Sequence, residues 1–473
     1  MFEFGCATAT DAEVFETRNP ARHSERVGRY GAVTPQDVAG HVTAARRAQR
    51  DWAALPVTAR LHRVGAFVDA VAAQADAIAR AITREQGKPL AEARGETAKS
   101  LDEARQMLAI AGQPLGAVHA SARPGVLPMS MRRPRGVIAA ITPWNFPILT
   151  PMRKVIPALA FGNAILLKPS ELAPAAAFLM AEAGRDLLPE GLLQLLPGDG
   201  ALGAALVASG AEGVTFTGSV GTGQAVFRAA AESLAELSLE LGGKNAALIH
   251  DAPDLDACLD QISAAAFLCS GQRCTAISRV IVPRDLAEAV TEGLVARAEA
   301  LVPGDGFAQG VTLGPLVSAD QRARVDALVQ QARAAGARLC TGGGAPDDPA
   351  LSEGHFYAPT ILDRMDAGNP AAREEIFGPV ISVLASDSLE HAFALLNDTD
   401  FGLTSALFST DACVINRFIA ESGSGMLHVN HGTTPDSNMP FVGIRNSGVG
   451  ACSVGPGAAA FYTTEHAVYL GTP

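Results

Sequence analysis

Short apolar runs that alternate with stretches of helical length constrain the fold of this chain more than any other feature. Five such runs occur in the first half of the chain, at 136–141, 164–168, 192–196, 214–217 and 246–249. The Ala- and Leu-rich stretches between them have the length of helices, at 151–161, 174–188, 200–209 and 221–233. Strands that are apolar on both faces and alternate with helices are typical of a mostly parallel sheet with helices on both sides.

A second alternating region follows, from about residue 254 to residue 430. Its pattern predicts helices at 254–269, 284–300 and 318–335, and strands at 279–282, 380–385 and 425–429. Residues 37–111 are predicted to be helical, since apolar residues such as Leu61, Val64 and Val68 recur at three- and four-residue steps. The end of the chain, 458–470, is β-like. We interpret it, together with 114–131, as an arm that pairs with another edge in this subunit or in another.

The charge balance limits the partners of the protein. Its 473 residues carry 37 Lys and Arg against 49 Asp and Glu, a formal net charge of −12 with a pI near 5.3. Such an acidic chain is not expected to bind nucleic acid or an anionic membrane surface. The seven cysteines form no Cys-x-x-Cys pair, which favours a reducing compartment over a disulfide framework or a zinc site. Neither a secretory signal nor an apolar run of the roughly 20 residues that a membrane span needs is visible, so we expect a cytoplasmic protein.

Cys274 and Glu240 are the residues most suggestive of catalysis. Cys274 ends the tetrapeptide Gly-Gln-Arg-Cys, and Glu240 opens the stretch Glu-Leu-Gly-Gly-Lys 34 residues upstream. A soft nucleophile in a glycine-bearing turn and a carboxylate that can act as a general base make covalent catalysis feasible. The cysteine alone is weak evidence, because most intracellular cysteines are small core residues.

Four other motifs have both a functional and an ordinary structural interpretation. The Gly-rich stretch 216–223 either approaches a phosphate at a helix N-terminus or is a common strand–helix turn. Lys168 and Glu171 follow a strand, where they either bind ribose hydroxyls or belong to a solvated loop. Asn145, between two aromatic residues and two prolines, either donates to an oxyanion or satisfies its own loop. Glu375, in Glu-Ile-Phe-Gly-Pro, either contacts a cofactor or begins a strand.

Taken together and in this order, the motifs resemble those of the aldehyde dehydrogenase superfamily. The set comprises Pro-Trp-Asn-Phe-Pro at 143–147, Lys-Pro-Ser-Glu at 168–171, Phe-Thr-Gly-Ser at 216–219, Glu-Leu-Gly-Gly-Lys at 240–244, Gly-Gln-x-Cys at 271–274 and Glu-Glu-Ile-Phe-Gly-Pro at 374–379. The resemblance covers residues 19–464, nearly the whole chain. An Arg-Lys pair at 153–154 resembles the pair that succinate-semialdehyde-type members carry in the corresponding place.

The resemblance implies three catalytic residues. Cys274 matches the nucleophile that attacks the aldehyde and forms first a thiohemiacetal and then a thioester. Asn145 matches the amide that stabilises the oxyanion together with the backbone N–H of Cys274. Glu240 matches the base that activates water for hydrolysis of the thioester. Because this Glu is usually absent from members that acylate coenzyme A, its presence favours release of a free carboxylic acid.

The same resemblance implies a dinucleotide site, with NAD favoured over NADP. Glu171 matches a residue that accepts a hydrogen bond from the ribose 2′-hydroxyl and would repel a 2′-phosphate. The implied cofactor-binding residues are Thr142, Trp144, Lys168, Ser170, Glu171, Phe216, Gly218, Ser219, Leu241, Gly242, Glu375 and Phe377. No metal is implied, because the oxyanion donors and the cofactor supply the electrophilic assistance.

Substrate recognition is implied at Arg153, which matches the residue that binds the distal carboxylate in succinate-semialdehyde-type members. An arginine suits bidentate recognition of a carboxylate, sulfonate or phosphonate, whereas the alternative is an ion pair on the surface of the helix 151–161. The chain departs from its relatives at Leu268, where semialdehyde members often carry a second Arg, and at Cys452, where many relatives have a Glu. Further substrate-binding candidates are Arg105, Phe146, Arg273 and His428.

The predicted reaction is therefore oxidation of a small-molecule aldehyde that bears a distal anionic group. Succinate semialdehyde is the first candidate, and longer dicarboxylate, sulfonated or phosphonated aldehydes come next. A broad-specificity or aromatic aldehyde dehydrogenase is the main alternative. A non-catalytic member that serves as a binding or structural protein is another, although the joint retention of Cys274, Glu240 and Asn145 argues against it.

The expected fold class is α/β, the aldehyde dehydrogenase fold. A Rossmann-like parallel-sheet cofactor domain is expected at 1–113 and 132–242, and an α/β catalytic domain at 243–443. A β oligomerisation arm at 114–131 and 444–473 would mediate formation of a homodimer or homotetramer.

Overall fold

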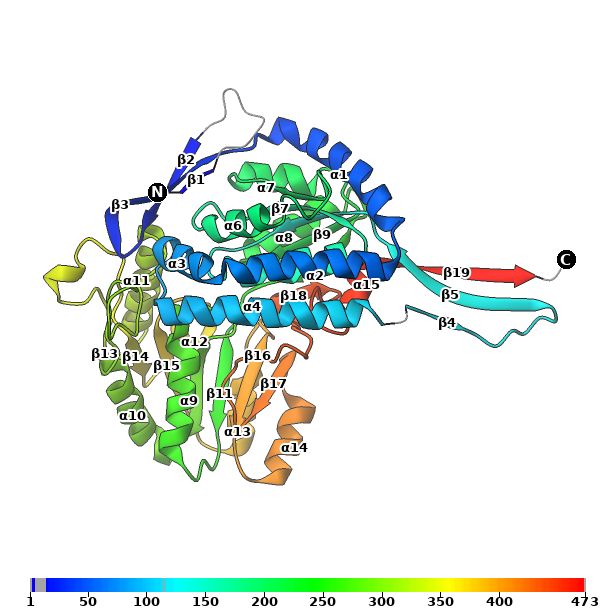
Figure 1. Cartoon of the computed structure of the whole chain (residues 1–473). Helices are drawn as coiled ribbons and strands as arrows, with labels where there is room; N and C mark the ends of the chain where they lie inside the picture. Colours follow the sequence, from blue (N-terminus) through cyan, green and yellow to red (C-terminus); the bar gives the residue numbers. More distant parts are fainter. Residues whose placement is uncertain (1, 5–13, 114, 472–473) are drawn as a thin grey trace.

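Two mostly parallel sheets form the body of the protein in a computed structural model that describes residues 2–4, 14–113 and 115–471 (Figure 1). The first sheet has six strands in the order β18-β10-β9-β6-β7-β8, of which only β18 runs antiparallel to its neighbour. Its strands are β6 (Val137–Ile141), β7 (Ala164–Lys168), β8 (Leu193–Leu195), β9 (Gly213–Thr217), β10 (Glu236–Glu240) and β18 (Gly448–Gly450). The parallel strands predicted at 136–141, 164–168, 192–196 and 214–217 are confirmed.

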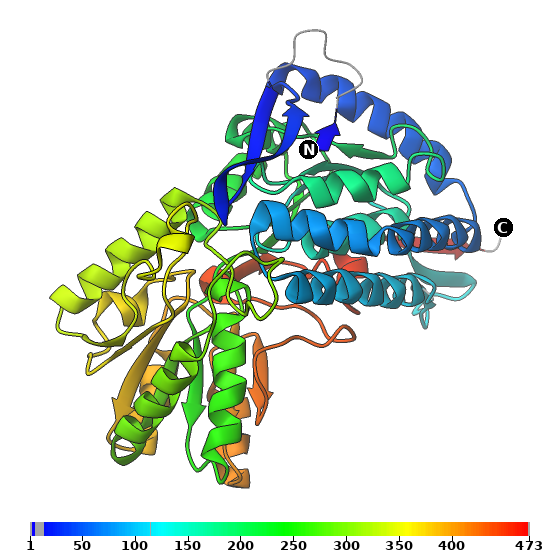
Figure 2. The ribbon, with the colours of Figure 1, turned by 60° about the vertical axis from the view of Figure 1, so that its left-hand side comes forward.

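Helices cover this first sheet. The segment predicted to be helical at 37–111 forms four helices in succession, shown in blue in Figure 2: α1 (Val38–Ala53), α2 (Val57–Ala73), α3 (Ala75–Gln86) and α4 (Leu90–Ala111). The crossover helices between the strands are α5 (Leu149–Ala160), α6 (Ala175–Ala183), α7 (Gly200–Val207) and α8 (Val220–Ala230). These are the helices that the Ala- and Leu-rich stretches predict.

The second sheet has seven strands in the order β13-β14-β15-β12-β11-β16-β17, and all but β13 are parallel. Its strands are β11 (Asn245–Ile249), β12 (Ile277–Pro283), β13 (Arg338–Thr341), β14 (Thr360–Asp363), β15 (Val380–Ser386), β16 (Thr404–Phe408) and β17 (Met426–Val429). Its helices are α9 (Leu255–Phe267), α10 (Ala287–Glu299), α11 (Ala319–Ala334), α12 (Pro370–Arg373), α13 (Leu389–Asn397) and α14 (Ala412–Glu421). Across the described residues, none of the helices combines the length and the apolar character needed to cross a membrane.

An arm of three antiparallel strands extends from the body (Figure 1). Its strands are β4 (Gly116–Val118), β5 (Val126–Pro134) and β19 (Thr463–Gly471), and β19 pairs with β5 along its whole length. The predicted association of 114–131 with the end of the chain is confirmed. The prediction that 458–470 is β-like is wrong at its start. Residues Ala458–Tyr462 form helix α15, since consecutive alanines favour a helix, and Phe461 and Tyr462 are fully buried in the core.

A small N-terminal sheet was not expected from the sequence. It consists of β1 (Phe2–Phe4), β2 (Val14–Asn19) and β3 (Arg22–Gly31) in the order β1-β3-β2. The predicted domain boundaries stay a prediction. Strand β18 and helix α15 belong with the six-stranded sheet and its core, although both fall within the segment 444–473 that we assigned to the arm.

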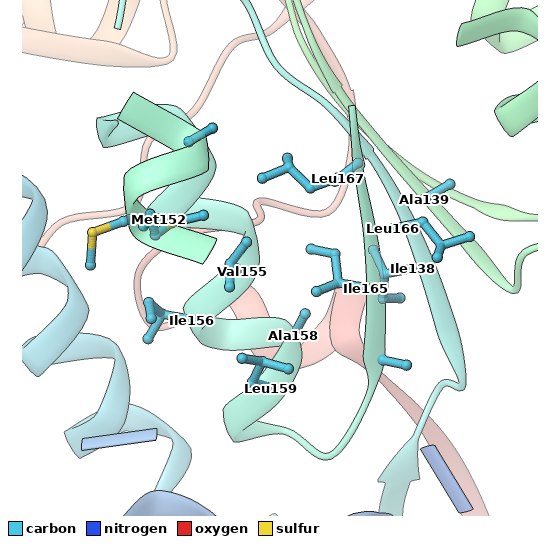
Figure 3. Packing of buried hydrophobic residues seen from close by; sticks show 14 of the residues in the cluster. Ile138, Ala139, Met152, Val155, Ile156, Ala158, Leu159, Ile165, Leu166 and Leu167 are labelled. Carbon is cyan, nitrogen blue, oxygen red and sulfur yellow. The ribbon is translucent and has the colours of Figure 1, made fainter. Parts of the chain in front are cut away.

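Helix α5 occupies the centre of the first core and carries two cationic side chains. It packs between α4 and β7, with Val155, Ala158 and Leu159 close to Ile165 (Figure 3). Every residue of α5 except Arg153 is buried. Full burial of a large aliphatic side chain contributes about 1.5–3 kcal/mol to stability, so this packing fixes the position of α5 and of the residues that it carries.

Candidate active site

A cavity of about 600 Å³ lies where the carboxyl ends of β9 and β10 meet the loop that precedes β12. Ligands of open α/β sheets bind at such strand ends. The cavity brings together thirteen of the residues predicted from the sequence. They are Trp144, Asn145, Phe146, Arg153, Gly218, Ser219, Glu240, Leu241, Gly242, Arg273, Cys274, Glu375 and Phe377.

A tightly constrained turn presents Cys274 to this cavity. The 3-10 turn Leu268–Gly271 places Cys269 and Ser270 in the left-handed region, at φ 56° and 55°. A Cβ on Gly271 would lie 2.1 Å from the carbonyl oxygen of Gly378, so only glycine fits there. The fully buried Gln272 side chain ties the turn to its neighbours, since its Nε2 donates to Cys269 O at 3.1 Å and its Oε1 accepts from Val317 N at 2.9 Å.

The thiol of Cys274 is held in its neutral form. Burial raises its pKa to about 12, and the nearby Glu375 carboxylate adds to this effect, while Arg153 and Arg273 oppose it. Because the thiolate is the nucleophilic form, a base or an added positive charge is needed to activate this residue at neutral pH.

The buried side chain of Asn145 lies directly beside the cysteine turn. Its Nδ2 donates to the carbonyl of Gln272 at 2.9 Å, which leaves its second N–H available for a ligand. The backbone carbonyl of Asn145 accepts from Nζ of the buried Lys88 at 2.7 Å. An amide held rigidly in the cavity that also contains the thiol can serve as an oxyanion donor.

Glu240, the last residue of β10, is surrounded by donors and cations. Its carboxylate accepts from Ser453 Oγ at 2.7 Å and from Thr217 Oγ1 at 3.0 Å, and Lys154 Nζ lies 3.9 Å away. Burial alone would raise its pKa, but Lys154, Arg153 and the two hydroxyls outweigh burial and lower it. Glu240 is therefore ionised at neutral pH and can accept a proton.

The edge of the first sheet has the features that a dinucleotide needs. Ser219 caps the N-terminus of α8 by accepting from Thr222 N at 3.3 Å, and a Cβ on Gly221 would meet nothing within 4 Å. A phosphate can therefore reach the first turn of the helix. Lys168 and Glu171 form an ion pair of 3.4 Å at the end of β7, and the Glu171 side chain is 47% exposed.

The remaining predicted cofactor residues lie on either side of this edge. Glu375 accepts from Gly243 N at 2.9 Å, and the Phe377 ring packs edge-on against Trp144 at 5.5 Å between centroids. Thr142, Lys168, Ser170, Glu171 and Phe216 do not line the cavity itself. Four of these five are buried, and the Thr142 hydroxyl has no hydrogen-bond partner among the described residues. An acidic group, a helix N-terminus and an adjoining cavity fit a dinucleotide.

Arg153 lies in the cavity wall and forms an ion pair, as the structural alternative expects, but the pair is buried and not on the outer surface. Its Nε and Nη2 donate to the two carboxylate oxygens of Glu103 at 2.6 and 2.7 Å, and its guanidinium lies 4.8 Å from the ring centre of Phe441. Both members of the pair are buried, with side chains 9% and 4% exposed. Burial lowers the pKa of Arg153, but Glu103 outweighs burial and raises it, so the guanidinium stays charged.

Two predicted substrate residues lie outside the cavity. Arg105 is exposed and faces Asp69 at 3.8 Å. It stands two residues after Glu103 on α4, which turns it about 200° away from the site. His428 lies on β17, the outermost strand of the seven-stranded sheet, and stacks on His431 at 5.5 Å. Burial and His431 lower the pKa of His428 to about 4, so it is neutral.

The other two substrate candidates do line the cavity. Phe146 lies under Nζ of Lys88 at 4.3 Å from its ring centre. Arg273 is buried and donates from Nη2 to Thr275 Oγ1 at 3.1 Å, while its Nε has no partner among the described residues. At the two departures from the family, Leu268 lines the cavity and Cys452 precedes Ser453, whose hydroxyl contacts Glu240.

A row of charged residues along α4, together with Lys88 before it, was missed by the sequence reasoning. Glu92 accepts from Cys269 N at 2.7 Å, which ties α4 to the cysteine turn. Glu96 pairs with Lys88 at 2.6 Å and accepts from the backbone N–H of Ile148 and Leu149 at the start of α5. The spacing of 88, 92, 96, 99 and 103 follows one helical face. That signal is visible in the sequence, but such a charged face is ordinarily solvated.

Two mostly parallel sheets, and a cavity that joins a thiol to an edge that fits a dinucleotide, are the arrangement of an α/β oxidoreductase. Comparison with known proteins gives the family directly. The model described as "Aldehyde dehydrogenase family" matches residues 7–468, and the chain belongs to this family. It is therefore an aldehyde dehydrogenase.

The relatives cover almost the whole chain. It is 37% identical to 3,6-anhydro-alpha-L-galactose dehydrogenase of Streptomyces coelicolor over 96% of this chain and 92% of that protein. It is 33% identical to alpha-ketoglutaric semialdehyde dehydrogenase of Bacillus subtilis over 97% and 95%. Its structure superposes on betaine aldehyde dehydrogenase of Staphylococcus aureus in complex with NAD+, with a TM-score of 0.94 and 28% identity over 98% and 93%.

Proposed function

We propose that the enzyme uses NAD and water to oxidise an aldehyde with a distal anionic group to its carboxylic acid. Succinate semialdehyde is the first candidate, and sulfonated or phosphonated aldehydes come next. The observation that carries this proposal is the charged guanidinium of Arg153 in the wall of the cavity that also contains Cys274. A relative that acts on a semialdehyde, the Bacillus subtilis enzyme, supports the same substrate class.

In the first step the thiol of Cys274 loses its proton to a base or to water, the sulfur forms a bond to the aldehyde carbon, and the carbonyl π bond breaks so that its oxygen becomes an oxyanion. The free N–H of Asn145 and the backbone N–H of Cys274 stabilise this oxyanion. One such preorganised donor contributes about 3 kcal/mol to the transition state. The hydrogen bond from Asn145 Nδ2 to Gln272 O holds the side-chain amide in place for this role, and the one from Lys88 Nζ to the backbone carbonyl of Asn145 fixes the loop that carries it.

NAD, when bound, would accept the hydride that leaves the thiohemiacetal carbon. We propose that Lys168 and Glu171 hold its adenosine ribose, that Gly218 and Ser219 approach its phosphates, and that Glu375 and Phe377 hold the other ribose. The exposed carboxylate of Glu171 would repel the 2′-phosphate of NADP. The solved relative from Staphylococcus aureus contains NAD+, which supports this choice.

Loss of the hydride leaves an acyl group on Cys274 as a thioester. Glu240 removes a proton from a water molecule, the water oxygen bonds to the acyl carbon, and the carbon–sulfur bond breaks to release the acid. The lowered pKa of Glu240 keeps it ionised for this step. Lys154 and Ser453 position the carboxylate, because both contact it from buried sites.

The substrate class is tested by comparing two aldehydes of similar size, succinate semialdehyde and butanal. Substitution Arg153→Leu should lower kcat/KM for succinate semialdehyde relative to butanal by at least about tenfold, since a hydrogen bond to a charged group contributes about 1.5–3 kcal/mol. An unchanged ratio of the two kcat/KM values would contradict recognition of the anion by Arg153. It would favour a broad-specificity or aromatic aldehyde dehydrogenase instead.

We also propose that the arm assembles the enzyme into a homodimer or homotetramer. Its strands expose the apolar residues Val118, Leu127, Tyr469 and Leu470, with Tyr469 73% exposed. Apolar residues exposed together on a projecting sheet are typical of an interaction surface. Sedimentation of the protein before and after removal of residues 463–473 tests this proposal, which predicts dissociation; an unchanged mass would contradict it.

A further inference from the structure

Lys99 and Arg153 reach the same carboxylate oxygen from two different helices. Lys99, on α4, places its Nζ 3.2 Å from Oε1 of Glu103, and Arg153, on α5, places its Nη2 2.7 Å from that same atom. Both cationic side chains line the cavity that contains Cys274, whereas Glu103 is buried behind them. Two cations that share one oxygen are close enough for one small anion to contact both.

The charges of this cluster do not cancel. Lys99 and Arg153 contribute two positive charges and Glu103 one negative charge, which leaves one positive charge at the cavity wall. Four carboxylates also line the cavity, of which Glu96 is paired with Lys88 and Glu240 with Lys154. The other two, Glu92 and Glu375, each accept from a backbone N–H, and two more cations of the lining, Arg273 and Arg324, offset their charge. The cluster around Glu103 therefore attracts a monoanion.

Both cations keep donors for a ligand. Arg153 uses Nε and Nη2 on Glu103, and its Nη1 has no hydrogen-bond partner among the described residues. Lys99 donates one N–H to the carbonyl oxygen of Pro435 at 2.8 Å, and its side chain is 26% exposed. Its ammonium has three N–H groups, so at least one remains available beside Glu103.

We propose that Lys99 is the second cation of an anion subsite and a specificity-determining residue for the substrate. The distal carboxylate would lie between Lys99 Nζ and Arg153 Nη1 while the aldehyde faces Cys274. This inference rests on the proposed oxidation of an anionic aldehyde and deepens it. Lys99 supplies here a second positive charge, which Leu268, another residue of the cavity wall, cannot supply.

A purely structural role for Lys99 makes a different prediction. Its bond to Pro435 O ties α4 to the segment 434–441, whose Thr434, Pro435 and Phe441 also line the cavity. If this hydrogen bond were the whole role of Lys99, its loss would lower activity on charged and neutral substrates alike. Recognition of an anion would instead lower activity selectively on the charged substrate and mainly through KM.

The experiment therefore uses substitutions that separate the positive charge of Lys99 from its hydrogen bond to Pro435. Lys99→Gln keeps an amide donor for Pro435 O but removes the positive charge, and Lys99→Arg keeps the charge. The matched control is Arg105→Gln, which removes an exposed positive charge from the same helix outside the cavity. Steady-state NADH formation is measured with succinate semialdehyde and with butanal, and thermal unfolding confirms that each variant is folded.

Lys99→Gln is expected to lower the ratio of kcat/KM for succinate semialdehyde to kcat/KM for butanal about tenfold, through KM. Lys99→Arg should keep most of the ratio, and Arg105→Gln should leave it unchanged. An equal fall for both substrates in Lys99→Gln, or an unchanged ratio, would overturn the role of Lys99. If the wild-type enzyme itself does not prefer succinate semialdehyde, the proposed substrate class fails instead, and with it this inference.

Discussion

The buried pair of Arg153 and Glu103 makes a strong prediction about stability. Breaking a buried ion pair by removing one partner costs about 3–5 kcal/mol, because the remaining charge stays buried without compensation. In Arg153→Leu the carboxylate of Glu103 still has one cationic partner, Lys99, whose Nζ lies 3.2 Å away. The Lys99 side chain is only partly buried. We therefore expect the free energy of unfolding to fall by about 3 kcal/mol, the lower end of that range.

The double substitution Glu103→Leu/Arg153→Leu removes both charges together. Replacement of a buried pair by apolar residues is often neutral or stabilising, so the double variant should recover to within about 1 kcal/mol of the wild type. Urea denaturation followed by circular dichroism measures these differences. Both variants should lose the preference for succinate semialdehyde, although only the single variant is unstable. A double variant as unstable as Arg153→Leu would refute the reasoning, because the cost would then lie in packing and not in the pair.

The pH dependence of this stability has a defined sign. Burial opposes ionisation of Glu103, but Arg153 and Lys99 outweigh burial and lower its pKa below the ordinary value of 4.5. A carboxyl whose folded-state pKa is lowered contributes stability above its ordinary pKa, and loses this contribution as the pH falls. The stability of the wild type relative to the double variant should therefore be greatest at neutral pH and decline in acid.

Three further predictions concern catalysis and the cofactor. Glu240→Gln should form about one equivalent of NADH per active site in a burst and then turn over about 10²–10⁴-fold more slowly than the wild type. The reason is that the acyl-enzyme is no longer hydrolysed by base catalysis. Absence of a burst would contradict this order of steps. The rate of alkylation of Cys274 in the enzyme without cofactor should rise about tenfold for each pH unit between about pH 7 and pH 9, since burial raises the pKa of this thiol to about 12. A plateau of the rate in this range would contradict the raised pKa. Glu171→Gln should lower the KM for NADP more than the KM for NAD, and equal changes would argue against contact with the ribose.

The fold could be predicted where the strands are buried on both faces. The runs at 136–141 and 246–249 are continuously apolar, as is 164–168 up to its last residue, Lys168, and each is a central strand or lies beside one. Strand β10 was missed because Glu236, Ser238 and Glu240 alternate with its apolar residues and give no apolar run. Its pairing with β9 and β18 buries these polar residues wholly or in part, and that pairing is a property of the tertiary structure.

The candidate site was predictable from short motifs and not from periodicity. The positions of Cys274, Asn145 and Glu240 follow from their motifs, and all three line one cavity. Arg105 and Glu103 could not be distinguished in the same way, because the rotation of α4 about its axis is set by its packing on α5. A charged residue on a helix is assigned to solvent by default, yet Glu103 is 3% exposed since Arg153 pairs with it.

The most direct test of the account is the substrate preference of the unmodified enzyme. NADH formation is measured with NAD and each of a matched pair of aldehydes, succinate semialdehyde and butanal, with Cys274→Ala as the inactive control. We predict that kcat/KM is at least about tenfold higher for succinate semialdehyde, in keeping with one charge-assisted hydrogen bond or more to its carboxylate. Equal or greater kcat/KM for butanal would contradict the account, as would wild-type activity in Cys274→Ala.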